Sequence, residues 1–139
     1  MERTAMCACG GLRVKVRGEP MRVAVCHCLQ CQKRSGSVFA DNAQFDRKAV
    51  VSIEGESKAY ARSTERGGRV TFHFCPRCGS SVYWDLSLDP NIVGIAVGAF
   101  GDPGFAKPTR SLFGVTRHHW VPPIEDGEAF LADQYGPKE

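Results

Sequence analysis

The chain has 139 residues and a mass of 15.2 kDa, the size of one domain. Hydrophobic residues make up 42% and charged residues 24%, a balance that supports a folded core and excludes a disordered chain. No run of eighteen apolar residues is present, and Met1 is not followed by the apolar stretch of a secretory signal. We therefore expect one cytoplasmic domain, residues 1–139, in a reducing compartment where clustered thiols bind metal or react.

Apolar residues in the first half of the chain recur with a period of two, which is typical of half-buried strands. In the first expected strand, Leu12, Val14 and Val16 alternate with basic residues. Further strands are expected at 23–25, 38–45, 50–53 and around Tyr60. One short helix is expected at 28–34, ended by Gly36.

The second half of the chain shows the same strand pattern. Strands are expected at 70–74, 81–84 and 92–97, the last interrupted by Gly94. The Gly- and Pro-rich segment 101–108 predicts a loop, and 128–134 could form a second short helix. The tail 136–139 is expected to fray. These patterns predict a mainly β domain with short helical inserts.

Seven cysteines occur in three groups, and an odd number cannot all pair as disulfides within one chain. Cys75 and Cys78 form a Cys-x-x-Cys pair followed by glycine, the sequence of a zinc knuckle. Cys7 and Cys9 form a tighter pair, also followed by glycine. Each pair stands at the end of an expected strand, so strand pairing can join all four sulfurs in one zinc site. The alternative is that these cysteines are simply free or buried.

The middle group, Cys26, Cys28 and Cys31, places three sulfurs within six residues. Three protein ligands with an open fourth position is the arrangement of a catalytic zinc, so these cysteines are also the candidate catalytic residues. Redox cycling of Cys28 and Cys31 as a disulfide is an alternative. The side chain of His27 is expected to face away from the metal, because neighbouring residues in extended chain point in opposite directions.

The remaining histidines and the net charge are less informative. His73, His118 and His119 lack ligand spacing, and we expect no metal role for them. The formal charge of +3 would fall to about zero with seven thiolates and two divalent ions. Because the basic residues are also scattered, the sequence does not favour a nucleic-acid partner.

Taken in order, the three cysteine motifs resemble those of a known family. Cys7-x-Cys9-Gly10, Val25-Cys26-His27-Cys28-x-x-Cys31 and Phe74-Cys75-x-x-Cys78-Gly79-Ser80 are similar to the motifs of the glutathione-dependent formaldehyde-activating enzymes. This family also contains centromere protein V. The resemblance covers the chain from about residue 4 to about residue 122.

The resemblance implies a β-tent fold and two Zn²⁺ ions per chain. A structural zinc would be held by Cys7, Cys9, Cys75 and Cys78, and a reactive zinc by Cys26, Cys28 and Cys31. The implied activity is that of a carbon–sulfur lyase, which reversibly joins formaldehyde and glutathione to S-hydroxymethylglutathione. The implied partner is therefore a small thiol such as glutathione.

Residues after the middle cysteine group are candidates for contact with such a thiol. Arg34 and Ser35, with Ser37, could orient its carboxylates or amides, although Arg34 could equally be a solvated surface charge. Phe39, Trp84 and Trp120 either wall a cleft or belong to the core. Many relatives carry a His-Ile-aromatic element where this chain has Ser111-Leu112-Phe113. A non-enzymatic zinc-binding interaction module and a thiol-redox protein using Cys28 and Cys31 are the alternatives, and the oligomeric state does not follow from the sequence.

Overall fold

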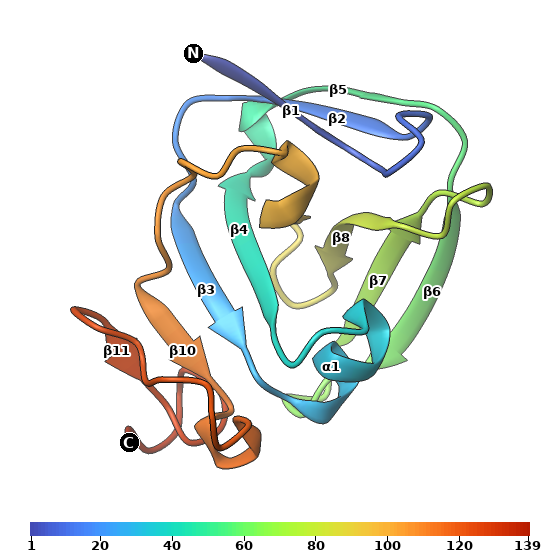
Figure 1. The fold of residues 1–139 in the computed structure, drawn as a ribbon. Coiled ribbons are helices and arrows are strands. Elements are labelled where there is room, and N and C mark those ends of the chain that lie inside the picture. Colours follow the sequence, from blue (N-terminus) through green and yellow to red (C-terminus); the bar gives the residue numbers. More distant parts are fainter. The chain divides into compact units, whose positions relative to one another are not determined.

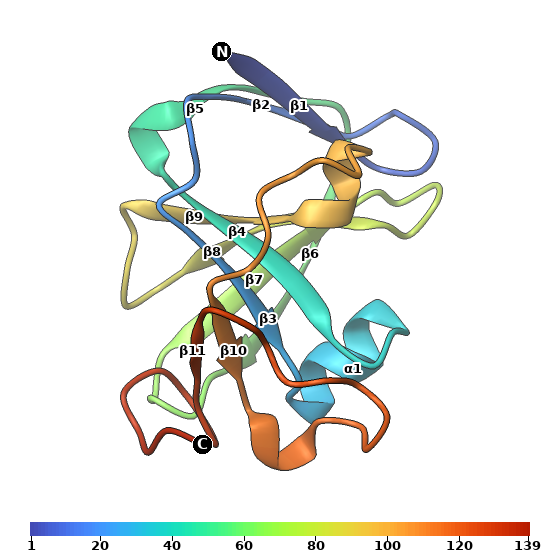
Figure 2. The same ribbon diagram turned by 60° about the vertical axis from the view of Figure 1, so that its left-hand side comes forward.

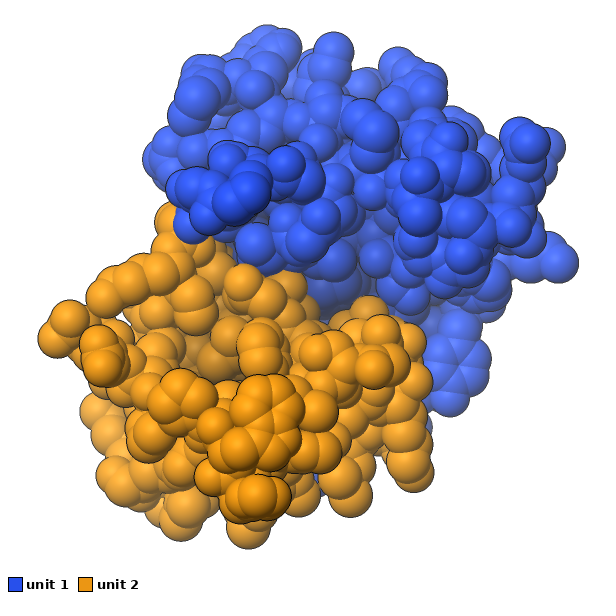
Figure 3. Space-filling model, viewed as in Figure 1, with its two compact units in different colours: residues 1–21, 43–105 blue, residues 22–42, 106–139 orange.

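The fold is mainly β, as the sequence predicts (Figure 1). A computed structural model describes residues 1–139 and contains eleven strands, one α-helix and three short 3-10 helices. None of its helices has the length and hydropathy needed to cross a membrane. The chain divides into two compact units, residues 1–21 with 43–105 and residues 22–42 with 106–139 (Figure 3).

The first unit contains a three-stranded antiparallel sheet. Its strands, in spatial order, are β1 (Glu2–Met6), β2 (Arg13–Arg17) and β5 (Val50–Glu54). In β2 the expected alternation is observed, since Val14 and Val16 are fully buried while the basic residues beside them face solvent. Strand β4 (Ala40–Asp46) enters this unit from the second one and continues into the 3-10 helix η1 (Arg47–Ala49).

Four further strands of the first unit form consecutive antiparallel pairs (Figure 2). They are β6 (Lys58–Ser63), β7 (Arg69–Phe74), β8 (Ser81–Leu86) and β9 (Ile92–Ala96), and the 3-10 helix η2 (Val97–Phe100) follows β9. Val70, Phe72 and Trp84 form one core cluster. Gly94 lies opposite Trp84 in the β8–β9 pair, where a Cβ atom would collide with the indole ring.

The second unit is built around two short parallel strand pairs. Its elements are β3 (Arg22–Cys26), α1 (Leu29–Ser35), β10 (Arg110–Leu112), the 3-10 helix η3 (Gly114–Thr116) and β11 (Glu128–Ala129). Strand β10 pairs with β3 on one side and with β11 on the other. Helix α1 ends at Gly36, whose positive φ of 72° provides the left-handed residue that a helix C-terminus favours.

Three details of the C-terminal region differ from the sequence-based expectations. Residues 128–134 form strand β11 and turns rather than a helix, because the Phe130 backbone N–H donates to the Ser111 carbonyl of β10. The tail is held rather than frayed: the Glu139 backbone N–H donates to Ala129, and its carboxylate pairs with Arg117 at 2.8 Å. Trp120 is 62% exposed and is not a core residue.

Candidate metal centres

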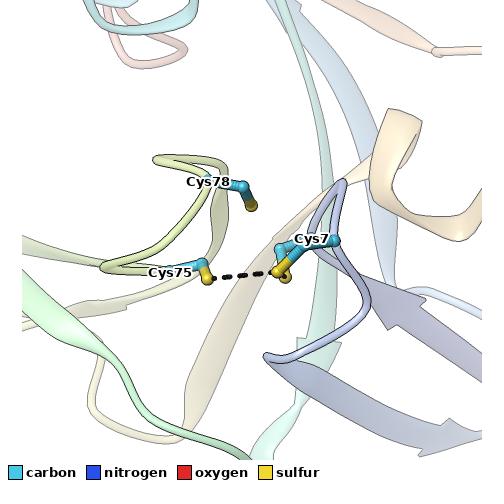
Figure 4. A group of neighbouring side chains, drawn as sticks. Cys7, Cys75 and Cys78 are labelled. Atoms are coloured by element: carbon cyan, nitrogen blue, oxygen red, sulfur yellow. Dashed lines mark hydrogen bonds between the residues drawn. The ribbon is translucent and has the colours of Figure 1, made fainter.

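The first cysteine cluster lies wholly within the first unit and joins two turns. Cys7 follows β1 and Cys75 follows β7, and the sulfurs of Cys7, Cys9, Cys75 and Cys78 all lie within 4.8 Å of one another (Figure 4). The Cys7–Cys9 and Cys9–Cys75 sulfur separations are both 3.6 Å. A tetrahedral zinc with Zn–S bonds of 2.3 Å needs sulfurs about 3.8 Å apart. The four sulfurs therefore fit one zinc ion.

Each of the two turns that carry these sulfurs is closed by the backbone N–H of a glycine. In the first, the Gly10 N–H donates to the Cys7 carbonyl at 2.9 Å; in the second, the Gly79 N–H donates to the Cys75 carbonyl at 2.8 Å. Both glycines have a φ of 78°, which side chains disfavour, and this explains why glycine follows each pair. Strand pairing after each turn then sets the two cysteine pairs side by side.

Ser80 links the two turns through its hydroxyl group. The hydroxyl oxygen accepts a hydrogen bond from the Ala8 N–H at 3.1 Å and lies 3.4 Å from the Cys78 sulfur. Since the oxygen already accepts from Ala8, its proton can be donated to a Cys78 thiolate. Hydrogen bonds from the side chain and backbone of Ser80 lower the pKa of Cys78 to about 5. Ser80 therefore favours the thiolate form that binds metal.

The second cysteine cluster lies wholly within the second unit and is local in sequence. Cys26 ends β3, Cys28 is the N-cap of α1, and Cys31 lies in the first turn of that helix. The three sulfurs lie within 4.8 Å of one another, and no fourth cysteine, histidine or carboxylate joins them. Cys26 and Cys31 are buried against Ala40, Leu112 and Phe113, whereas Cys28 is partly exposed.

Without a cation between them, the buried thiols of the second cluster resist deprotonation, because each thiolate would lie close to the others. Hydrogen bonding to Cys28 and Cys31, together with burial, raises the pKa of Cys26. Hydrogen bonding to Cys26 lowers the pKa of Cys31, but Cys28 and burial outweigh this effect and raise it overall. The Cys28 sulfur accepts a hydrogen bond from the Cys31 N–H at 3.2 Å. Three converging sulfurs are a ligand set that suits zinc.

His27 lies between two of these cysteines, but its ring is directed elsewhere. The ring is buried, its Nε2 atom lies 3.2 Å from the Ser111 hydroxyl, and it packs edge-on against Phe39. Burial, and then the positive charge of Arg117, lower the pKa of His27. The ring is therefore neutral at pH 7, and it does not belong to the sulfur cluster.

The backbone beside the second cluster is held by Gln32 of α1. Its Nε2 donates to the His27 carbonyl at 2.8 Å and to the Thr116 carbonyl at 3.1 Å, while its Oε1 lies 2.8 Å from His118 Nε2. The Thr116 hydroxyl also donates to the His27 carbonyl, at 2.8 Å. Gln32 thus ties the peptide between Cys26 and Cys28 to segment 113–118.

Of the other residues considered in the sequence, Arg34 and Ser35 lie in α1 with the second cluster, whereas His73 lies in the first unit. Arg34 is half-buried in α1, and its positive charge contributes a minor lowering to the pKa of Cys31. Ser35 is exposed, and its hydroxyl accepts from the Ser37 N–H. His73 bonds to Asp85 at 2.7 Å in the first unit. The sequence did not indicate that Ser80, although it lies in the family motif, joins the two turns. It also did not indicate that Gln32 holds the backbone beside the second cluster.

The site and fold define a mainly β protein with two cysteine clusters that could hold metal ions. The family model described as glutathione-dependent formaldehyde-activating enzyme matches residues 2–116, and the chain belongs to this family. Among solved structures, it is similar to the crystal structure of a Rhodobacter sphaeroides protein, with a TM-score of 0.55 and 20% sequence identity. That match covers 76% of this chain and 91% of the other, and it concerns the fold. No match to a curated protein was found.

Proposed function

We propose that this protein is a zinc-dependent carbon–sulfur lyase that acts on a thiol adduct, with glutathione and formaldehyde as the leading substrate pair. The observation that carries the proposal is the second cluster, where three cysteine sulfurs converge without a fourth protein ligand in a member of this family. A closed site needs four ligands, so three leave one position for a substrate.

The reaction joins two molecules without oxidation or reduction. A carbon–sulfur bond forms between the thiol sulfur and the carbonyl carbon of formaldehyde, and the thiol proton ends on the carbonyl oxygen. The reverse reaction breaks the same bond and returns the proton. The protein must therefore hold the thiol in its reactive, deprotonated state and admit a small aldehyde beside it.

The residues of the second unit are suited to this task. Cys26, Cys28 and Cys31 would hold the zinc, which when bound supplies a positive charge that lowers the pKa of a thiol nearby. Buried Cys26 and Cys31 form the closed side of the site, and partly exposed Cys28 marks the side open to substrate. Leu112 and Phe113 exclude water from the closed side.

We assign a structural role to the first cluster and substrate contacts to two residues of α1. Cys7, Cys9, Cys75 and Cys78 would hold a second zinc with all four positions filled by protein. In the second unit, Arg34 and Ser35 would contact the thiol substrate from the last turn of α1. Two zinc ions per chain are therefore expected.

The proposal is tested by exchange NMR with formaldehyde and glutathione, together with metal content measured by elemental mass spectrometry. We expect two zinc ions per chain and faster exchange than in buffer alone. Cys28→Ser should reduce the acceleration at least tenfold, whereas Lys33→Ala, a change at an exposed position of the same helix, should not.

Three results would contradict the proposal. They are exchange at the buffer rate with every thiol tried, equal thiol binding by Cys28→Ser and the parent protein, and a fourth protein ligand at the second zinc. A disulfide between Cys28 and Cys31 in protein with one zinc per chain would instead indicate a thiol-redox role.

A further inference from the structure

We propose that Arg117 and Glu139 are positioning residues of the second cysteine cluster: their ion pair holds the C-terminal clasp, residues 128–139, on the turn that begins at Phe113. The side chain of Phe113 packs against the buried cysteines of that cluster. The inference rests on the proposed function only in treating the second cluster as the reactive site. Both charged residues lie beyond residue 116, where the match to the family model ends.

Phe113 has an unusual backbone conformation. Its φ of 58° and ψ of 46° lie in the left-handed region, which bulky side chains disfavour. Apart from glycines, only Phe113 and Asp126 have a positive φ. A residue in such a conformation persists only where its surroundings hold it there. The contacts that hold the Phe113 backbone therefore also determine where its ring lies against Cys26 and Cys31.

The C-terminal clasp supplies these contacts through its backbone. The N–H groups of residues 113–115 donate to carbonyl oxygens of residues 130–132, at 2.8, 2.9 and 3.3 Å. A left-handed residue beside helical ones can direct successive N–H groups to one side, where they bind negatively charged atoms. The clasp thus provides the acceptors for the turn at Phe113.

The ion pair between Arg117 and Glu139 lies directly on this turn. Arg117 Nη1 donates to both carboxylate oxygens of Glu139 at 2.8 Å. The two side chains are only 19% and 22% exposed, so removal of one partner leaves the other charge poorly solvated. A Cβ atom added at Gly114 would lie 2.5 Å from the carboxylate carbon of Glu139. A side chain at position 114 would therefore displace this carboxylate.

Thr116 joins the same turn to the second cluster. Its hydroxyl group donates to the Phe113 carbonyl at 3.2 Å and to the His27 carbonyl at 2.8 Å. The ion pair is close enough to act on the His27 ring, since burial and then Arg117 lower the pKa of His27 while Glu139 raises it. Contacts therefore connect the ion pair with the backbone between two cysteines of the second cluster.

This arrangement determines which sulfurs of the second cluster meet solvent. Cys26 and Cys31 are buried with Leu112 and Phe113 packed against them, whereas Cys28 is partly exposed. Apolar groups around a metal site control the access of solvent to it. While the clasp is closed, a substrate approaches from the side of Cys28. Loss of the ion pair releases Phe113 and opens the two buried sulfurs to water and solutes.

The experiment measures how fast N-ethylmaleimide modifies each cysteine of the metal-loaded protein, by peptide mass spectrometry. In the parent protein, Cys28 should react faster than Cys26 and Cys31, because it is the most accessible of the three. Glu139→Gln should raise the rates at Cys26 and Cys31 at least about tenfold, which corresponds to a loss of about 1.4 kcal/mol in the free energy that keeps the clasp closed. The rate at Cys28 should stay within about threefold of the parent value, since this sulfur is already accessible.

Further variants separate positioning from a general loss of stability. Gly114→Ala keeps both charges but displaces the Glu139 carboxylate, and it should have the same selective effect. Gly136→Ala, whose Cβ comes no closer than 3.7 Å to another residue, should have none. Arg117→Glu combined with Glu139→Arg restores a pair of opposite charges and should return the rates toward the parent values. Lys107→Gln, which removes an exposed ion pair of the same unit, is the control for loss of charge and should change nothing.

The outcomes separate this inference from the lyase proposal. Unchanged rates at Cys26 and Cys31, or no recovery in the charge-exchanged variant, overturn the positioning role even if the protein accelerates formaldehyde exchange. An equal rise at all seven cysteines also overturns it, because the variants then only destabilise the protein. A selective rise with recovery supports the positioning role even if exchange is not accelerated, and then only the lyase proposal fails.

Discussion

Replacing Gln32 with alanine should weaken zinc binding at the second cysteine cluster and leave zinc binding at the first cluster unchanged. The change removes three side-chain hydrogen bonds of 2.8 to 3.1 Å, which join α1 to the His27 carbonyl, the Thr116 carbonyl and the His118 ring. At about 1 kcal/mol for each bond the loss would reach about 3 kcal/mol, and access of water to this half-buried side chain reduces it to about 2 kcal/mol. Because Thr116 still donates to the His27 carbonyl, the backbone keeps one of its supports.

The assay is zinc release to a chelator, followed by the zinc remaining per chain. Groups that orient a metal ligand typically change metal affinity 10- to 100-fold, so the variant should lose one of two zinc ions at a chelator concentration that spares both in the parent. Gln30→Ala is the matched control, since Gln30 is an exposed residue of the same helix. Equal retention of both ions, or equal weakening of both, would refute the view that Gln32 positions the ligands of the second cluster alone.

Three further predictions concern other parts of the chain. Ser80→Ala should weaken zinc at the first cluster about 10- to 100-fold in the same chelator assay, and an unchanged release profile would contradict the role of its hydroxyl. Gly94→Ala should destabilise the protein by at least about 2 kcal/mol in thermal unfolding because its Cβ collides with Trp84, whereas Gly98→Ala, which meets nothing within 4 Å, should change stability by less than about 0.5 kcal/mol. Burial raises the pKa of Asp41 to about 6, so the folded state holds this proton more tightly than the unfolded state and stability should fall as pH rises from 4 to 6. Asp41→Asn should remove that fall and be the more stable protein at pH 8 in urea unfolding; a parallel loss in both proteins would contradict the assignment.

The parts of the fold that follow a repeating pattern could be predicted from the sequence. Alternation of apolar and basic residues located β2, and the glycine after Arg34 and Ser35 marked the end of α1. The cysteine motifs predicted which sulfurs the structure would bring together, because each pair follows a strand and a glycine turn directs both sulfurs to one side. Each of these signals lies within a few neighbouring residues, so it can be recognised in a single sequence.

The C-terminal region could not be predicted in this way, because its structure depends on distant partners. Residues 128–134 have a composition that allows a helix, but pairing with β10 makes an extended conformation more favourable. The C-terminal tail is ordered because the Glu139 carboxylate accepts hydrogen bonds from Arg117, which is 22 residues away. The contacts of Gln32 with Thr116 and His118 also depend on the fold, because these partners are 84 and 86 residues away and no sequence motif predicts the pairing.

The two cysteine clusters differ greatly in the length of chain that each one closes. Cys9 and Cys75, which share the first cluster, are 66 residues apart, whereas the second cluster is contained within a six-residue segment. Closing the longer loop costs about 2 kcal/mol more in chain entropy. During synthesis, the short segment can therefore capture a metal ion as soon as it is made, while the long loop can do so only after its last turn has been made and its strands have paired. Metal at the first cluster thus requires that two turns far apart in the sequence have come together, whereas the ligands of the second cluster are brought together by local structure.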